Sequence, residues 1–97
     1  MYTRVVTLQI QPGKAEEAVR IFRDSVVPAA KQQPGFKSAL LMTDSNGGKG
    51  IAITFWETEA DREANEGSGY FQQQVAKVGQ VVAAPPTREN YEVRFQG

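Results

Sequence analysis

Alternating apolar and polar residues predict β-strands in four segments of the chain. The first segment covers residues 2–10, where Val6, Leu8 and Ile10 alternate with more polar neighbours. The same period of two recurs in residues 36–44, 51–56 and 88–95. Successive side chains of a strand point to opposite faces, so this period is typical of a strand with two different environments.

Apolar residues at three- and four-residue spacing predict helices in two further regions. The first begins after Pro12-Gly13, bends or restarts at Pro28 and ends by about Gln32, because proline disrupts the preceding turn. In the second region Thr58 is a good N-cap for a short helix that ends near Glu66. After the break at Gly67-Ser68-Gly69, helical spacing resumes at Phe71, Val75, Val78 and Val82.

The predicted order is strand, helix, strand, strand, helix, strand. Asn46-Gly47-Gly48 tolerates the positive φ angles of a tight turn, so the two central segments form an antiparallel hairpin. Two crossovers around a hairpin give an α+β, ferredoxin-like βαββαβ fold, a four-stranded antiparallel sheet with both helices on one face. We predict a single domain over residues 1–97.

Several strands are apolar on both faces, which predicts a partner for the sheet. Residues 51–56 place Ile51, Ile53 and Phe55 on one side and Trp56 on the other. A large exposed apolar patch is unusual in a monomer, and a symmetric homodimer joined through the sheet face would bury it. The alternative is that the surface apolar residues are scattered and need no partner: Val5, Ala39 and Leu41.

The composition excludes several function classes. With 11 basic and 11 acidic residues in 97 the net charge is zero, so neither nucleic acid nor an anionic membrane is an expected partner. The chain has no cysteine and no histidine, which excludes thiolate chemistry and a histidine-based triad or metal site. No apolar run is long enough to span a bilayer, and we expect a cytoplasmic protein. The last two or three residues resemble the remnant of a cleaved tag.

The order and spacing of several short motifs resemble the antibiotic biosynthesis monooxygenase-like family of dimeric α+β barrels. The matching pieces are Pro12-Gly13-Lys14, Pro28, Gln33-Pro34-Gly35-Phe36, Phe55-Trp56-Glu57-Thr58, Tyr70-Phe71, and the closing Pro86 and Tyr91-Glu92-Val93. The resemblance implies a ferredoxin-like subunit that pairs with a second copy, with a small cavity between sheet and helices. It also implies activities that range from cofactor-free oxygenases and quinol oxidation to haem degradation.

Departures from the family pattern reduce the number of these activities that fit this chain. Haem-degrading relatives hold iron through a histidine, where this chain offers Asn65 and Glu66. Asparagines that the family uses for catalysis are replaced by Val6 and Ala52, and related lyases and cyclases use a His-Tyr pair that this chain lacks. Of the family's site residues, only Trp56 carries over at a matching position.

Five residues are candidates for substrate binding, and each has a structural alternative. Trp56 could lie against a flat aromatic ligand or fill the core, and Tyr70 could donate a proton at the cavity mouth or bond to backbone. Phe71 could form a pocket wall or could be an ordinary core residue. Asn65 could bind a substrate oxygen or could be a helix C-terminal residue. Arg88 could neutralise a phenolate or could be a solvated surface cation. Trp56 and Tyr70 are the candidates for catalysis.

The expected function is that of a cofactor-independent monooxygenase or quinol-type oxidase acting on a small phenolic or polyketide-like aromatic compound. Such chemistry requires no cofactor and no metal, because an electron-rich phenolate can itself reduce dioxygen. The alternative is a homodimer of the same fold that binds a small molecule or serves structure without catalysis.

Overall fold

The sheet has four antiparallel strands in the order β2-β3-β1-β4, and the computed structural model describes all residues from 1 to 97. This order, with a helical crossover on each side of the central hairpin, confirms the ferredoxin-like prediction. The strands are β1 (Tyr2–Gln9), β2 (Phe36–Thr43), β3 (Lys49–Trp56) and β4 (Thr87–Glu92).

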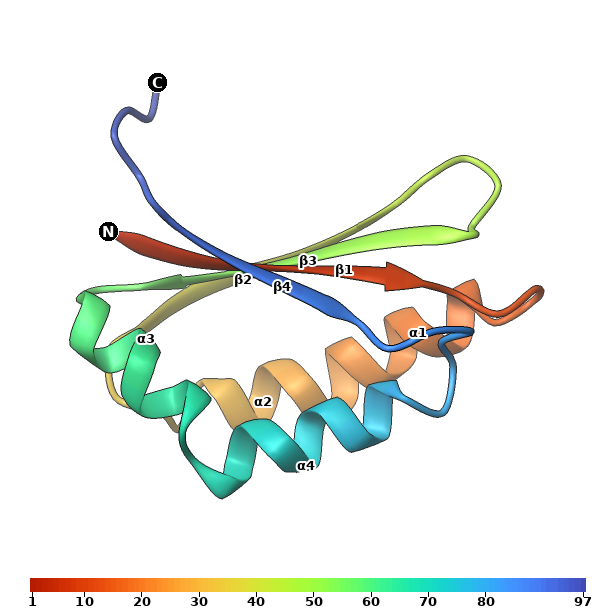
Figure 1. The fold of residues 1–97 in the computed structure, drawn as a ribbon, viewed down its shortest axis with the longest axis horizontal. Helices are drawn as coiled ribbons and strands as arrows, with labels where there is room; N and C mark the ends of the chain where they lie inside the picture. Colours follow the sequence, from red (N-terminus) through yellow and green to blue (C-terminus); the bar gives the residue numbers. More distant parts are fainter.

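All helices cover one face of the sheet, as Figure 1 shows. The first crossover contains α1 (Ala15–Ile21), a π-helical turn η1 (Phe22–Val26) and α2 (Val27–Ala30). The second contains α3 (Glu59–Glu66) and α4 (Gly69–Val78). Side-chain caps set the start of both later helices, because Thr58 and Ser68 accept hydrogen bonds from the amides of Asp61 and Phe71.

The first helical segment restarts near Pro28 and ends at Ala30, within the predicted limit of about Gln32. The sequence did not predict that it widens into the π-helical turn η1 before the proline. Pro28 explains the widening, because it has no N–H to donate to the preceding turn and its ring crowds the carbonyl there. The backbone continues past Pro28 as α2, so the proline changes the helix type without ending the segment.

The last strand is shorter than predicted, ending at Glu92 instead of Phe95. Its partner β1 begins at Tyr2, opposite Glu92, so the ladder runs out of partner residues there. One further hydrogen bond joins the amide of Val93 to the carbonyl of Met1. Beyond it the chain leaves the sheet on the side away from the helices (Figure 1), and Phe95 is 90% exposed.

Strand register assigns the apolar residues of β2 to faces, and it corrects the sequence interpretation. Ala39 and Leu41 pair with Thr54 and Ala52, which face the helices, so neither belongs to the exposed face. Leu41 instead packs against the core. We call the side of the sheet away from the helices the outer face. Its apolar residues are Val5, Leu40, Met42, Ile51, Ile53 and Phe55.

The packed core has two parts, at opposite ends of the helix-facing side of the sheet. One part is the cluster of Leu8, Ile10, Ala18, Val81 and Val82. The other is the ring of Trp56, which is fully buried and meets the Phe36 ring edge-on at 5.6 Å. None of the helices is long and apolar enough to cross a membrane.

Candidate functional site

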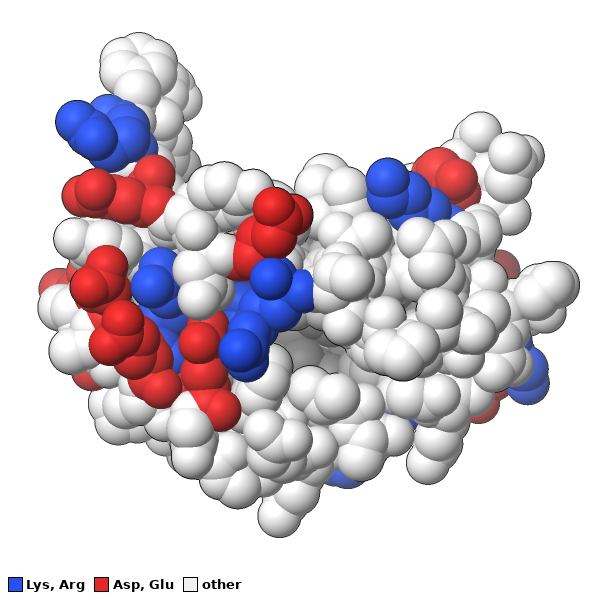
Figure 2. All heavy atoms as spheres, in the orientation of Figure 1, with Lys and Arg blue, Asp and Glu red and all other residues white.

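A cavity of about 380 Å³ lies between the helix-facing side of the sheet and the helices η1 and α4. Figure 2 shows it as a hollow in the surface between β4 and α4, with a basic side chain beside it. Its volume is in the range of small-molecule sites, roughly 300–1,000 Å³. Fourteen residues line it: Arg4, Val6, Leu8, Phe22, Val26, Ala52, Thr54, Tyr70, Phe71, Gln74, Val75, Val78, Pro86 and Arg88.

Strand alternation and helix periodicity bring these residues together. In β1 every second side chain faces the cavity, from Arg4 through Val6 to Leu8. The register then places Thr54 and Ala52 of β3 beside Arg4 and Val6, so the cavity floor is continuous across the strands. The roof is the face of α4 that carries residues at three- and four-residue spacing: Phe71, Gln74, Val75 and Val78.

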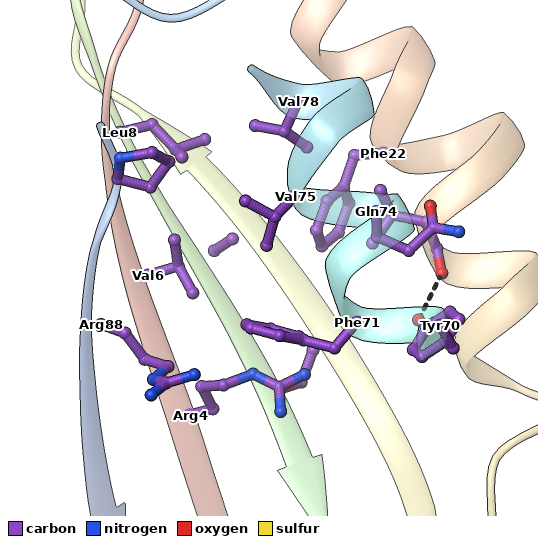
Figure 3. Close-up of a pocket in the computed structure, with 14 residues that line it drawn as sticks. Arg4, Val6, Leu8, Phe22, Tyr70, Phe71, Gln74, Val75, Val78 and Arg88 are labelled. Carbon is purple, nitrogen blue, oxygen red and sulfur yellow. Dashed lines mark hydrogen bonds between the residues drawn. The ribbon is translucent and has the colours of Figure 1, made fainter. Parts of the chain in front are cut away.

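The cavity has an apolar body and a cationic end. Figure 3 shows Arg4 and Arg88 together below the Phe71 ring, whereas Leu8 and Val78 lie at the opposite end. The Arg88 guanidinium carbon lies 5.4 Å from the centre of the Phe71 ring and that of Arg4 only 4.4 Å. Both distances allow cation–π attraction. A ligand with a flat apolar frame and one polar edge matches this division.

Arg4 is the most buried charged group in the cavity wall, with 5% of its side chain exposed. Its guanidinium lies between two aromatic rings, 4.4 Å from the centre of Phe71 and 5.3 Å from that of Trp56. Its Nη1 is 3.8 Å from Oε1 of Glu66, too far for a hydrogen bond. Burial lowers the pKa of Arg4 to about 10, opposed mainly by the Glu66 carboxylate, so the group is cationic at neutral pH.

Tyr70 contributes its ring to the cavity wall while its hydroxyl is held by the backbone. The hydroxyl donates a hydrogen bond of 3.2 Å to the carbonyl of Val26. Burial raises the pKa of the Tyr70 phenol, and the nearby positive charge of Arg4 opposes that shift. The phenol is therefore neutral at physiological pH. Beside it, Gln74 accepts a 3.4 Å hydrogen bond from Ser25.

Trp56 lies behind the cavity wall and does not line it. Its indole N–H donates a 2.9 Å hydrogen bond to the hydroxyl of Thr54, which does line the cavity. Its ring also supports the buried guanidinium of Arg4. The indole therefore positions two groups that face the cavity.

Asn65 lies on α3, outside the main cavity. Its side chain is buried, and neither its amide nitrogen nor its oxygen has a hydrogen-bond partner. It borders a separate recess of about 80 Å³ with Gln33, Pro34, Asp61 and Ala64. Its backbone carbonyl accepts hydrogen bonds from Ser68, which fits a residue at the end of a helix.

The structure thus brings together three of the five candidate residues, Tyr70, Phe71 and Arg88, and places Trp56 and Asn65 elsewhere. Sequence reasoning missed Arg4. The signal was present, because Arg4 has the same alternation as Val6, Leu8 and Ile10. A charged residue at a core-facing position is rare and indicates a special environment. No cluster of three or more carboxylate, histidine or cysteine side chains is close enough to hold a metal ion.

The fold and the cavity define a ferredoxin-like α+β chain with room for a small molecule between its layers. Residues 1–77 match the family model for antibiotic biosynthesis monooxygenase, and the chain belongs to this family. The uncharacterized protein Rv2558 of Mycobacterium tuberculosis is 34% identical over 67 residues, which cover 68% of this chain. The match covers only 28% of that relative, so the chain spans less than a third of its length.

Solved structures with low sequence identity share the fold. A monooxygenase from the gene ActVA-Orf6 of Streptomyces coelicolor, in complex with nanaomycin D, aligns with a TM-score of 0.84 at 20% identity and covers 98% of this chain and 88% of its own. SnoaB, a cofactor-independent oxygenase from Streptomyces nogalater, aligns with a TM-score of 0.82 at 16% identity and covers 98% and 94%. Rv0793 from Mycobacterium tuberculosis aligns at 0.76 and 17%, covering 98% and 96%.

Proposed function

We infer that the protein is a cofactor-independent monooxygenase acting on a small phenolic aromatic compound. The observation that carries this proposal is the cavity of about 380 Å³, apolar along most of its length, with aromatic walls and two guanidinium groups at one end. The family match and the names of the two Streptomyces relatives support the same reaction class.

The proposed reaction takes its electrons from the substrate. A phenolate with a free para carbon, as in an anthrol, transfers one electron to dioxygen, and the two radicals join through a new C–O bond. Loss of water from the resulting hydroperoxide breaks the O–O bond and the remaining C–H bond and leaves a quinone. One oxygen atom stays in the product and the other leaves as water, so no external reductant is consumed.

The residues of this chain would bind and shield that substrate. The apolar walls exclude water from the radical pair, and the two guanidinium groups favour the phenolate over the phenol because opposite charge lowers a pKa. Trp56 would position Thr54 and Arg4 from behind the wall, and Tyr70 and Phe71 would contact the aromatic frame. Asn65 has a role only if a ligand reaches the smaller recess on α3.

Oxygen uptake with a panel of anthrols and quinols tests the proposal. We expect uptake above the buffer rate for at least one anthrol, with an anthraquinone-type product and one O₂ consumed per product. Ala52→Leu extends a side chain into the cavity and should abolish the excess rate. The matched control Ala76→Leu adds the same atoms to an exposed position of α4 and should leave it unchanged. Uptake at the buffer rate across the panel would refute the oxygenase.

A ligand-binding homodimer without catalysis is the second candidate. The observation that favours it is the Tyr70 hydroxyl, which is bonded to the carbonyl of Val26 and is not free to transfer a proton. Such a protein would bind the same aromatic compounds, with a rise in melting temperature, and would consume no oxygen. In either candidate we propose that a second copy covers the outer face, because Leu40 and Met42 are 50% and 47% exposed there.

A further inference from the structure

Arg4 lines the cationic end of the cavity, and one carboxylate lies next to its guanidinium. Nη1 of Arg4 and Oε1 of Glu66 form a buried ion pair at 3.8 Å, which is too long for a hydrogen bond, so neither atom has a hydrogen-bond partner. Glu66 does not line the cavity, so this pair lies behind the wall. An anionic ligand in the cavity would give the Arg4 guanidinium a second counter-charge.

The charges around Arg4 do not balance. Arg88 lines the same end of the cavity, and Arg62 on α3 is also buried, whereas Glu66 is the single carboxylate that acts on Arg4. Arg62 is directed elsewhere, because its Nη1 donates a 3.5 Å hydrogen bond to the carbonyl of Thr3 and its guanidinium lies 5.8 Å from the centre of the Tyr2 ring. The cavity therefore faces two guanidinium groups with one carboxylate behind them.

Geometry makes these two groups complementary to one anionic edge. Both guanidinium carbons lie near the Phe71 ring, which leaves the two side chains on neighbouring parts of one wall. Figure 3 shows the head of Arg88 beside the Arg4 side chain, with the apolar cavity beyond Phe71. A guanidinium presents a planar fork of donors, which suits a carboxylate or phenolate better than a neutral oxygen.

We propose that Arg4 and Arg88 form an oxyanion subsite, in which the two guanidinium groups at the cavity end donate to the anionic oxygen of a flat aromatic ligand. The inference deepens the proposed function and rests on it for the choice of an aromatic frame. It assigns a specificity role to Arg4, so the site selects for negative charge as well as for shape.

A matched ligand pair tests the subsite without any turnover. Titration calorimetry with 2-naphthoate and 2-naphthamide compares the same frame with and without charge. We expect naphthoate to bind about 10- to 100-fold more tightly, which corresponds to the net gain of about 1.5–3 kcal/mol for a charge-assisted hydrogen bond. Equal binding of the two compounds, or no binding of either, would overturn the subsite.

Variants assign the preference to the two residues. Arg88→Gln alters an exposed side chain of β4 and should reduce the naphthoate preference several-fold with the fold intact. Arg4→Lys retains the charge but loses the fork, and Arg4→Gln with Glu66→Gln removes both buried charges together. We expect the naphthoate preference to fall in Arg4→Lys and to disappear in the variant that combines Arg4→Gln with Glu66→Gln. Arg94→Gln, an exposed cation outside the cavity, is the control and should have no effect.

If Arg4→Lys and the paired variant both keep the full preference while circular dichroism shows them folded, Arg4 is not part of the subsite. The absorbance of bound 2-naphthol shows whether the subsite takes a phenolate or a carboxylate. A lowered naphthol pKa on binding identifies a phenolate subsite, whereas an unshifted pKa with retained naphthoate preference identifies a carboxylate subsite. A naphthoate preference without oxygen uptake refutes only the oxygenase, and oxygen uptake without the preference refutes only the subsite.

Discussion

Replacing Trp56 with phenylalanine tests whether the indole supports the cavity from behind. The change removes the hydrogen bond to Thr54, worth about 1 kcal/mol. It leaves a void of roughly 35 Å³, which costs about 0.8 kcal/mol at ~24 cal/mol per Å³. It also weakens the attraction to the Arg4 guanidinium 5.3 Å away, by about 0.5 kcal/mol. The free energy of unfolding should therefore fall by about 2 kcal/mol if these contributions add.

The assay is urea unfolding followed by far-ultraviolet circular dichroism, because the variant lacks the chain's one tryptophan. For a chain of this size the loss corresponds to a melting temperature lower by roughly 8–16 °C. Phe95→Leu is the control, since Phe95 is 90% exposed and its loss should change stability by less than about 0.5 kcal/mol. A Trp56→Phe loss as small as that of the control would refute a supporting role for the indole.

Three further predictions concern the turn, the charge and the outer face. Gly35→Ala should lower the free energy of unfolding by about 1–2 kcal/mol, measured by thermal unfolding, because φ is +78° there and a Cβ would collide with the Asp61 carboxylate. The control Gly48→Ala meets no atom and should be neutral, so equal effects of the two changes would contradict this reasoning. Naphthoate affinity should stay flat up to roughly pH 9 and fall above about pH 10, because Arg4 then loses its proton. Glu66, Tyr70, Arg62 and Arg88 are the charged and titratable groups that act on Arg4. Unchanged affinity at pH 11 in a folded protein would exclude Arg4 from the subsite. Light scattering should report twice 10.7 kDa for the protein and 10.7 kDa for Ile53→Lys at the centre of the outer face, whereas a monomeric unmodified protein would exclude the dimer.

The sequence was sufficient for the fold because local signals agreed with one another. In β1, Val6, Leu8 and Ile10 alternate with Thr7 and Gln9, so the sequence indicates the buried side of the strand although Val5 on the other face is also apolar. In β2 the run from Ala39 to Met42 is apolar throughout, and alternation cannot say which side faces the helices. Pairing with β3, after a register shift between Phe36 and Ser38, makes that choice. Such a choice depends on contacts that are distant in sequence.

The site was less predictable because alternation gives the face of a residue but not its distance along the cavity. Trp56 and Ala52 share the helix-facing side of β3, yet only Ala52 reaches the hollow. Trp56 lies two residues beyond Thr54 on the same face, at the end of β3, and the Arg4 guanidinium lies between its indole ring and the cavity. Arg4 was not predicted because a charged residue on a strand is ordinarily solvent-exposed, whereas here it lines the cavity.

The cavity is a region between sheet and helices that the side chains of this chain do not fill. The core cluster around Leu8 and the buried Trp56 lie at opposite ends of it, and the apolar side chains of Val6, Ala52 and Val75 line it between them. Filling that volume should therefore raise stability, and Ala52→Leu should add about 0.5–2 kcal/mol to the free energy of unfolding. The same variant should lose the stabilisation that 2-naphthoate gives the unmodified protein.

These opposite effects are the signature of a hollow that is retained for a ligand. Ala76→Leu, exposed on α4, should change neither quantity. If Ala52→Leu instead destabilises the fold by more than about 1 kcal/mol, the region is already close to full packing density, and neither the oxygenase nor the oxyanion subsite has room to bind an aromatic frame.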